Sequence, residues 1–205
     1  MSESIKKIGI FGGTFDPVHL GQIGLAKDAK EQAALDEIVF VPAWLQPFKL
    51  DKEITPGKNR LAMLRLALEP FPDFKVSSYE LDSDTVSYTY LTMREMQKTY
   101  GQDCKLYFIT GTDTFLKIEA WKEAEELLTK YAYIVGTRPG YRQDELKDCI
   151  DRISKAYNTE VRNIDNIQMD ISSTDIRTIL ESGYSAADLI PEEVERYIKV
   201  NGLYK

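Results

Sequence analysis

The chain has 205 residues, of which 43% are hydrophobic, and it carries a net charge of −7 at pH 7 with a sequence pI of about 4.9. This length suits one large domain, so we expect a single domain over residues 1–205. The negative charge argues against general binding to nucleic acid or to an anionic membrane surface. An anionic small molecule would therefore need a locally positive site.

Several features predict a cytoplasmic location. No apolar run approaches the roughly 20 residues that span a bilayer. The polar N-terminus reaches an apolar segment within a few residues, so we expect no signal peptide. Cys104 and Cys149 are far apart and have no nearby Cys or His partner, which predicts reduced thiols and no zinc site or disulfide framework.

Predicted strands and helices alternate along the chain. The predicted strands are short apolar runs at 6–11, 37–42, 75–78, 105–110, 131–136 and 160–164. The predicted helices are 17–34, 57–69, 88–100, two short helices on either side of Trp121, 144–157, and two that begin near 173 and 191. This alternation predicts right-handed βαβ units and an α/β fold of the Rossmann-like, doubly wound type, with a mostly parallel sheet and helices on both faces.

The first predicted strand runs directly into Gly-Gly-Thr-Phe-Asp-Pro-Val-His-Leu-Gly-Gln, residues 12–22. The glycines allow a sharp turn and a close approach of a ligand to the backbone. Asp16 is predicted to be an N-cap and Pro17 the first helical residue, which places His19 in the first turn. Unpaired N–H groups and the positive end of the helix dipole favour a phosphate there. His19 and Gln22 are three residues apart, so we expect them to share a face of that turn.

A second motif lies near the other end of the chain, in Asp-Ile-Ser-Ser-Thr-Asp-Ile-Arg at 170–177. Ser172 is a natural N-cap, and Asp175 three residues later completes a capping box. One interpretation is an ordinary well-capped helix. The other is an anion cradle made of the helix N-terminus, two hydroxyls and a guanidinium, on Ser173, Thr174 and Arg177.

Further polar residues follow the ends of predicted strands, where parallel sheets bind ligands. Lys49 follows the second predicted strand and Arg138 the fifth. The run Gly111-Thr112-Asp113 follows the fourth and predicts either a tight turn with an N-cap or an aspartate that binds ribose hydroxyls. Trp121, taken without context, is more typical of core or satellite packing than of ligand stacking.

These motifs together resemble the signature of the nucleotidyltransferase superfamily, and Gly12 to His19 is similar to the bacterial nicotinate-mononucleotide adenylyltransferases. That family carries His-x-Gly-His where this chain has His-Leu-Gly-Gln at 19–22. It carries Pro-Pro-His-Lys where this chain has Gln-Pro-Phe-Lys at 46–49. Residues 172–177 resemble the Ser-Ser-Thr-x-x-Arg element that holds the ATP phosphates. The resemblance extends from Gly9 to Tyr204.

The resemblance implies transfer of an adenylyl group from ATP, with Mg²⁺ on its phosphates, to nicotinate mononucleotide in NAD biosynthesis. It implies catalytic roles for His19, Gln22, Lys49 and Arg177. It implies ATP binding by Gly12, Gly13, Thr14, Phe15, Gly111, Asp113, Arg138, Ser172, Ser173 and Thr174. It implies acceptor binding by Tyr88, Thr89 and Trp121, with Trp121 stacked on the pyridine ring and 87–89 near the carboxylate. We expect no protein-held metal and no nucleic-acid or membrane partner, and the sequence leaves the oligomeric state open.

The predicted chemistry needs no general base, because the attacking phosphate is already an anion at neutral pH. Catalysis would rest on positioning and on donors aimed at the developing phosphate charge. Two alternatives within the class use nicotinamide mononucleotide or a phosphopantetheine as the acceptor, and Trp121 and Thr89 argue against the latter. A third alternative is a nucleotide-binding module with weak or lost catalysis. In that case Gln22 and Phe48, which replace the two histidines of the family, reflect the loss of catalytic activity.

Overall fold

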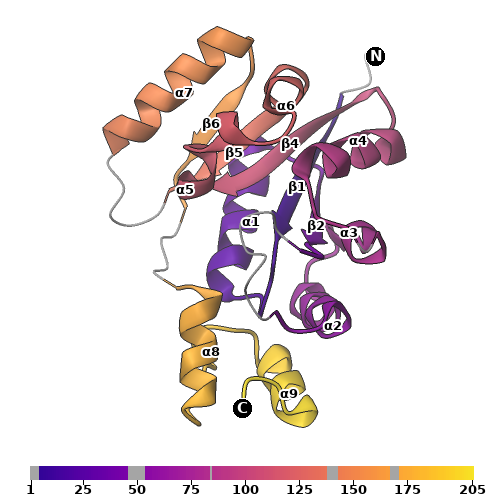
Figure 1. The fold of residues 1–205 in the computed structure, drawn as a ribbon, viewed down its shortest axis with the longest axis vertical. Coiled ribbons are helices and arrows are strands. Elements are labelled where there is room, and N and C mark those ends of the chain that lie inside the picture. Colours follow the sequence, from indigo (N-terminus) through magenta and orange to yellow (C-terminus); the bar gives the residue numbers. More distant parts are fainter. Residues whose placement is uncertain (1–4, 46–53, 84, 138–142, 167–170) are drawn as a thin grey trace.

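The computed structural model describes residues 5–45, 54–83, 85–137, 143–166 and 171–205. Six strands form one sheet in the order β3-β2-β1-β4-β5-β6, and every neighbouring pair is parallel (Figure 1). The strands are β1 (Lys6–Gly13), β2 (Glu37–Pro42), β3 (Phe74–Val76), β4 (Cys104–Gly111), β5 (Ala132–Gly136) and β6 (Val161–Ile164). The chain order reverses between β1 and β4, as in Rossmann-type folds, which confirms the predicted fold class.

The helices of the described residues also follow the predicted alternation. They are α1 (Leu20–Ala33), α2 (Gly57–Leu68), α3 (Tyr79–Asp82), α4 (Thr89–Tyr100), α5 (Thr112–Phe115), the 3₁₀ helix η1 (Ile118–Ala120), α6 (Ala124–Lys130), α7 (Gln143–Tyr157), α8 (Ser173–Glu181) and α9 (Glu192–Asn201). None of these described helices is both long enough and apolar enough to span a bilayer.

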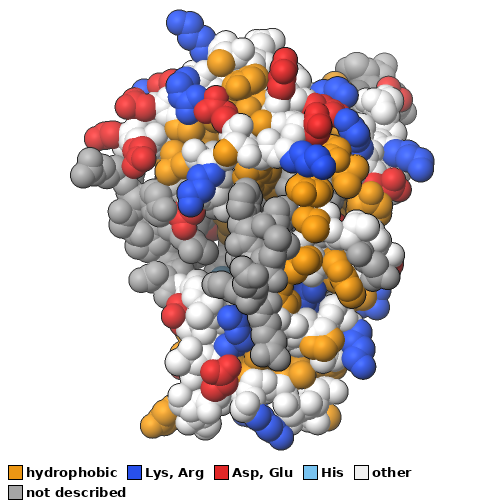
Figure 2. All heavy atoms as spheres, viewed as in Figure 1, with side chains coloured by type: hydrophobic (Ala, Val, Ile, Leu, Met, Phe, Trp, Pro, Cys, Tyr) orange, Lys and Arg blue, Asp and Glu red, His pale blue; other side chains and the backbone are white. Residues whose placement is uncertain are grey.

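Helices cover both faces of the sheet, and the strands bury both faces. In β1, Ile8 and Ile10 pack in one apolar cluster with residues of α4, α6 and α7, while Phe11 packs in the other with residues of α1, α2, α8 and α9. Alternate residues of β2 divide in the same way. This period of two with apolar residues on both sides is typical of parallel sheets enclosed by helices. Figure 2 shows acidic and basic side chains interspersed over the described part of one face.

The start of α1 differs from the prediction. The helix begins at Leu20 with His19 as its N-cap, so Asp16 is not the cap and Pro17 is not helical. The Asp16 side chain is instead used in tertiary contacts, where it accepts hydrogen bonds from Tyr204 and from the backbone of Thr55. These partners lie far away in sequence, and they override the local signal of an Asp-Pro pair.

Two smaller differences lie at the edge of the sheet. The third strand is Phe74–Val76 rather than 75–78, because only three residues pair with β2 before the chain turns away. The short helix α3 was not predicted, since four residues carry too little periodicity to reveal a helix. Elsewhere, between β4 and β5, the structure has three helical segments, α5, η1 and α6, where two short helices were expected. The remaining boundaries agree with the prediction to within one or two residues, which is the usual uncertainty of helix and strand ends.

Candidate functional site

The carboxyl ends of four neighbouring strands bring the predicted motifs to one edge of the sheet. The backbone N–H of Ala43, just after β2, donates to the Gly13 carbonyl at 2.8 Å. The Thr112 hydroxyl, just after β4, donates to the Gly136 carbonyl at the end of β5, 3.0 Å away. The loops that follow β1 and β4 flank the point where the strand order reverses. In an open parallel sheet this is where a ligand binds.

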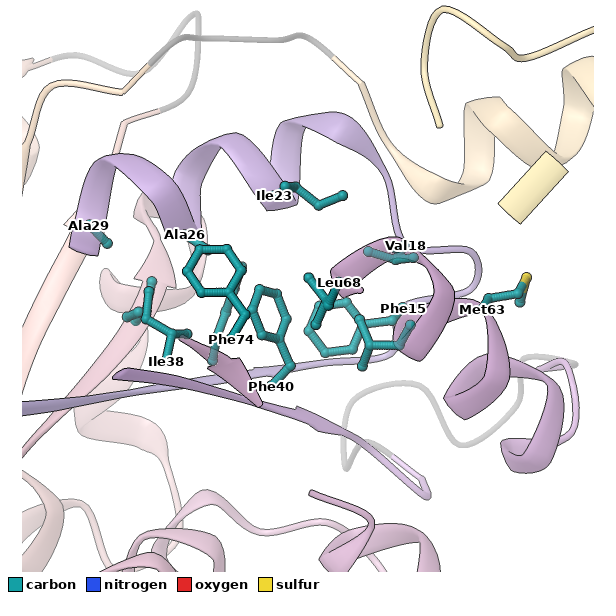
Figure 3. Packing of buried hydrophobic residues seen from close by; sticks show 14 of the residues in the cluster. Phe15, Val18, Ile23, Ala26, Ala29, Ile38, Phe40, Met63, Leu68 and Phe74 are labelled. Carbon is teal, nitrogen blue, oxygen red and sulfur yellow. The ribbon is translucent and has the colours of Figure 1, made fainter. Parts of the chain in front are cut away.

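The loop between β1 and α1 is held in place by an aromatic side chain. Phe15 has a φ of 52° and is buried, with its ring 5.7 Å from the rings of both Phe11 and Phe40. Figure 3 shows Phe15 and Val18 among the buried residues of the sheet and α2. A Cβ on Gly13 would lie 3.0 Å from the Phe15 ring, so glycine allows the ring to fold back against the strand. The Phe15 side chain therefore fixes the loop from the core, so any ligand that reached this residue would meet its backbone rather than its ring.

His19 and Gln22 lie together at the N-terminus of α1, as predicted. The backbone N–H of Gln22 donates to His19 Nδ1 at 3.3 Å, and the backbone N–H of His19 donates to Gln22 Oε1 at 3.2 Å. Since Nδ1 accepts, the proton of a neutral imidazole is assigned to Nε2. The backbone N–H of Leu20 donates to the Leu189 carbonyl at 2.9 Å. These three N–H groups at the helix start are thus used within the protein, so an anion would depend more on side chains and on the dipole than the sequence suggested.

The N-terminus of α8 packs onto the same loop. Ser173 Oγ donates to the carbonyl of Pro17 at 2.9 Å, and Arg177 Nη1 donates to the carbonyl of Asp16 at 2.6 Å. Arg177 Nη2 also donates to Thr174 Oγ1 at 3.3 Å. The predicted capping box of Ser172 and Asp175 is confirmed. Two motifs from opposite ends of the sequence therefore lie side by side, near the lower end of α1 in Figure 1.

Arg60, which belongs to none of the predicted motifs, supports the loop from behind. Its side chain is only 1% exposed, and its guanidinium donates to the carbonyl of Thr14 at 2.7 Å and to that of Thr55 at 2.8 Å. Burial lowers the Arg60 pKa, and the nearby charge of Asp16 opposes this shift. Arg60 lies in the apolar stripe of α2 with Met63, Leu64 and Ala67. An arginine in such a stripe indicates a buried charge that needs partners from elsewhere in the fold.

The residues predicted to bind the acceptor also come together. Tyr88 caps α4 and Thr89 is the first residue of that helix. Lys122 Nζ lies 4.4 Å from the centroid of the Tyr88 ring, and the neighbouring Trp121 meets Phe108 edge to face, with ring centroids 5.8 Å apart. Phe108 also lies next to Gly12, where an added Cβ would be 3.5 Å from its ring. The half-buried Trp121 is therefore placed beside the end of β1.

The other predicted residues either fall outside the described ranges or lie near the end of β4. Lys49, Phe48 and Arg138 lie outside the described residues. Gly111 ends β4, and Asp113 lies in the first turn of α5 beside the reversal point of the sheet. Within the described ranges, no group of three or more His, Cys, Asp or Glu side chains is arranged to hold a metal ion.

Comparisons with known proteins identify relatives of this chain. Residues 10–179 match the model of the cytidylyltransferase-like family. A Thermoanaerobacter relative, described as a "probable nicotinate-nucleotide adenylyltransferase", is 40% identical over 199 residues, which cover 97% of this chain and 94% of the relative. A Carboxydothermus hydrogenoformans relative with the same description is also 40% identical, over 97% of this chain and 98% of its own.

The fold is also similar to that of a solved structure. The nicotinic acid mononucleotide adenylyltransferase of Plasmodium falciparum, complexed with NaAD, superposes with a TM-score of 0.77 over 97% of both chains at 23% identity. At this identity the likeness establishes the fold, while the family model and the curated relatives establish the kinship. The chain belongs to the cytidylyltransferase-like family and, within it, to the nicotinate-nucleotide adenylyltransferases.

Proposed function

We propose that this protein transfers the adenylyl group of ATP to nicotinate mononucleotide, forming nicotinate adenine dinucleotide and pyrophosphate. The descriptions of its curated relatives support this activity. The observation that carries it is the convergence of α8 on the loop after β1, where Ser173 and Arg177 contact the backbone of Pro17 and Asp16. That contact places a guanidinium close to the helix start that carries His19.

In the proposed reaction, a phosphate oxygen of nicotinate mononucleotide attacks the α-phosphorus of ATP. The bond between that phosphorus and the oxygen bridging to the β-phosphate breaks, and pyrophosphate leaves with the electron pair. The negative charge that develops on the phosphoryl oxygens needs preorganised donors. His19 Nε2–H, the Gln22 amide and Arg177 supply them in this proposal, with Lys49 and Arg138 as further cations.

Mg²⁺ is proposed to enter on the phosphates of ATP, as part of the substrate. Hard oxygen ligands such as phosphate and water suit this ion. Asp16, a buried carboxylate next to the phosphate loop, does not fit as a protein ligand. Its Oδ1 accepts from Tyr204 at 2.6 Å and its Oδ2 accepts from the Thr55 N–H at 3.2 Å. Its oxygens are thus committed to structural hydrogen bonds.

The proposed acceptor site lies between Trp121 and the start of α4. The cap residue Tyr88 makes no side-chain capping bond in this 12-residue helix, and we propose that an anion from outside the helix takes the place of the cap. A carboxylate on the pyridine ring would be stabilised there by the helix dipole and backbone N–H groups. A neutral carboxamide would gain less, which is why we propose the acid as the substrate. We also propose a cytoplasmic location, where both substrates are available.

The direct test is turnover. Purified protein is incubated with ATP, Mg²⁺ and nicotinate mononucleotide, and the dinucleotide and pyrophosphate are quantified by chromatography and a coupled pyrophosphate assay. Equal amounts of both products are expected. Binding of ATP without product formation would instead support the nucleotide-binding module. The variant Arg177→Ala, which removes a proposed donor, separates enzyme turnover from a contaminating activity.

A further inference from the structure

We propose that Tyr204 is a positioning residue for adenylyl transfer, which acts through Asp16 to keep Arg177 available to the nucleotide phosphates. This inference rests on the function proposed above. Tyr204 lies at the far end of the sequence from the loop after β1, yet its hydroxyl donates to Asp16 Oδ1 at 2.6 Å. Asp16 is 3% exposed and lies three residues before His19. The end of the chain thus reaches the segment that leads into the proposed catalytic helix.

Asp16 offers Arg177 two competing acceptors. Arg177 Nη1 lies 2.6 Å from the Asp16 carbonyl oxygen but 3.9 Å from carboxylate Oδ2. The carbonyl is therefore the preferred partner, and the carboxylate is satisfied by Tyr204 and by the Thr55 N–H. A buried carboxylate that loses a hydrogen bond attracts a nearby cation more strongly. Without the Tyr204 hydroxyl, we expect the guanidinium to shift from the carbonyl toward the carboxylate and so away from the phosphates.

Two properties of Tyr204 suit this role. Its φ of 56° is left-handed, a conformation that residues other than glycine adopt rarely, so the ring is held there against a local preference. Burial, together with the charge of Asp16, raises the pKa of the phenol above its ordinary value of 10.0. The hydroxyl therefore remains a donor throughout the pH range in which such an enzyme works.

A purely structural role is the alternative, because Tyr204 also fastens the chain after α9. Tyr197 provides a matched control for that role. Its hydroxyl donates to Asn59 Oδ1 at 3.1 Å and so ties α9 to α2, with Asn59 rather than Asp16 as the acceptor. If Tyr204 only fastened the end of the chain, Tyr204→Phe and Tyr197→Phe would lower the melting temperature by similar amounts. The two variants would then also have the same kcat and KM values.

The test compares Tyr204→Phe, Tyr197→Phe, Asp16→Asn and the double variant Asp16→Asn/Tyr204→Phe. For each, kcat and KM are measured for ATP and for nicotinate mononucleotide, together with the melting temperature. Tyr204→Phe is expected to lose about tenfold in kcat/KM for ATP, the scale of one misplaced charge-assisted hydrogen bond, with little change in the KM of the acceptor. Tyr197→Phe is expected to keep the kinetics of the parent.

The double variant decides whether the effect passes through Asp16. In the Asp16→Asn background the carboxylate no longer competes for Arg177, so the further loss caused by Tyr204→Phe should shrink to about twofold or less, as non-additive pairs do. An undiminished loss in that background, or Tyr204→Phe kinetics equal to those of Tyr197→Phe, would overturn the inference. A parent protein that forms no dinucleotide would refute the proposed function instead, so the two failures are distinguishable.

Discussion

The side chains of His19 and Gln22 each cap the backbone of the other, because His19 Nδ1 accepts from the Gln22 N–H while Gln22 Oε1 accepts from the His19 N–H. The acceptor atoms of both side chains are thus committed to the start of α1. Each side chain also carries a donor group, the Nε2–H of the imidazole and the NH₂ of the amide. Structural and catalytic roles are therefore combined in the same two residues, and substitutions have to be chosen to separate them.

His19→Ala is expected to lose at least about 100-fold in kcat, the usual cost of removing a transition-state donor, together with about 1 kcal/mol of stability from the lost cap. His19→Asn is the control, because asparagine caps helices well but has no imidazole. The Asn variant should melt close to the parent and be as slow as the Ala variant. His19 is the only histidine, so its single ring signal in NMR spectra should shift when ATP and Mg²⁺ bind. Near-normal turnover by His19→Asn would mean that the residue is structural only.

The proposed acceptor site at the N-terminus of α4 predicts a preference for the acidic acceptor. We expect kcat/KM for nicotinate mononucleotide to exceed that for nicotinamide mononucleotide by at least about tenfold, because a site that pairs a carboxylate leaves donors unsatisfied with an amide. Competition between the two acceptors, with the products separated by chromatography, measures this ratio. Equal values would contradict the assignment of the acidic substrate.

Stability should depend on pH through Glu126, which links α6 to α4. Hydrogen bonds from Arg94 and then from Lys130 lower the pKa of Glu126 from 4.5 to about 2. A depressed carboxylate pKa stabilises the fold above the unfolded-state value of 4.5, and this contribution disappears as the pH falls toward 2. Glu126→Gln should therefore lower the melting temperature by about 1–3 °C at pH 7 and by less at pH 3.

The exposed pair of Glu192 and Arg196 provides the control for this prediction, since its atoms are 2.8 Å apart but both side chains are largely open to solvent. Glu192→Gln should change the melting temperature little at either pH, because exposed pairs contribute little. If Glu126→Gln lowered the melting temperature as much at pH 3 as at pH 7, the effect would come from packing rather than from ionisation of the carboxylate.

The sequence predicted the order of elements well because each strand is a short apolar run bounded by turn residues. It also predicted that His19 and Gln22 lie together and that Ser172 and Asp175 form a capping box, since these relationships span only three residues. Local spacing determines such contacts. The fold class followed from the alternation of strands and helices, which leaves few topologies other than a parallel sheet.

The sequence did not predict how Asp16 is used, because its partners come from distant parts of the chain. The Asp-Pro pair resembles a helix start, but Tyr204 and Thr55 bind the carboxylate and the helix begins three residues later. The role of Arg60 was not predicted for the same reason, because the carbonyls of Thr14 and Thr55 approach its guanidinium only in the folded protein. Long-range hydrogen bonds to buried charges leave no periodic pattern in the sequence from which they could be predicted.

In the resemblance to the His-x-Gly-His motif, Gln22 takes the place of the second histidine, and its amide can donate to a phosphate but cannot carry charge. Charge-assisted hydrogen bonds are roughly twice as strong as neutral ones, so Gln22→His should raise kcat on the order of tenfold with little change in the KM of ATP. Gln22→Ala should lower kcat, since the donor is then absent. A pocket shaped for the amide, or compensation by Lys49 or Arg177, would make Gln22→His neutral or harmful instead.

Gln22→Glu separates the cap from the donor. A carboxylate can still accept from the His19 N–H, as the Gln22 oxygen does at 3.2 Å, so the melting temperature should stay near that of the parent. Because it offers no donor and adds negative charge beside the phosphates, this variant should be slower than Gln22→Ala. Steady-state kinetics and melting curves on all three variants measure these effects. If Gln22→Ala turns over as fast as the parent, Gln22 has no catalytic role, and the site depends on His19 and the cations around it.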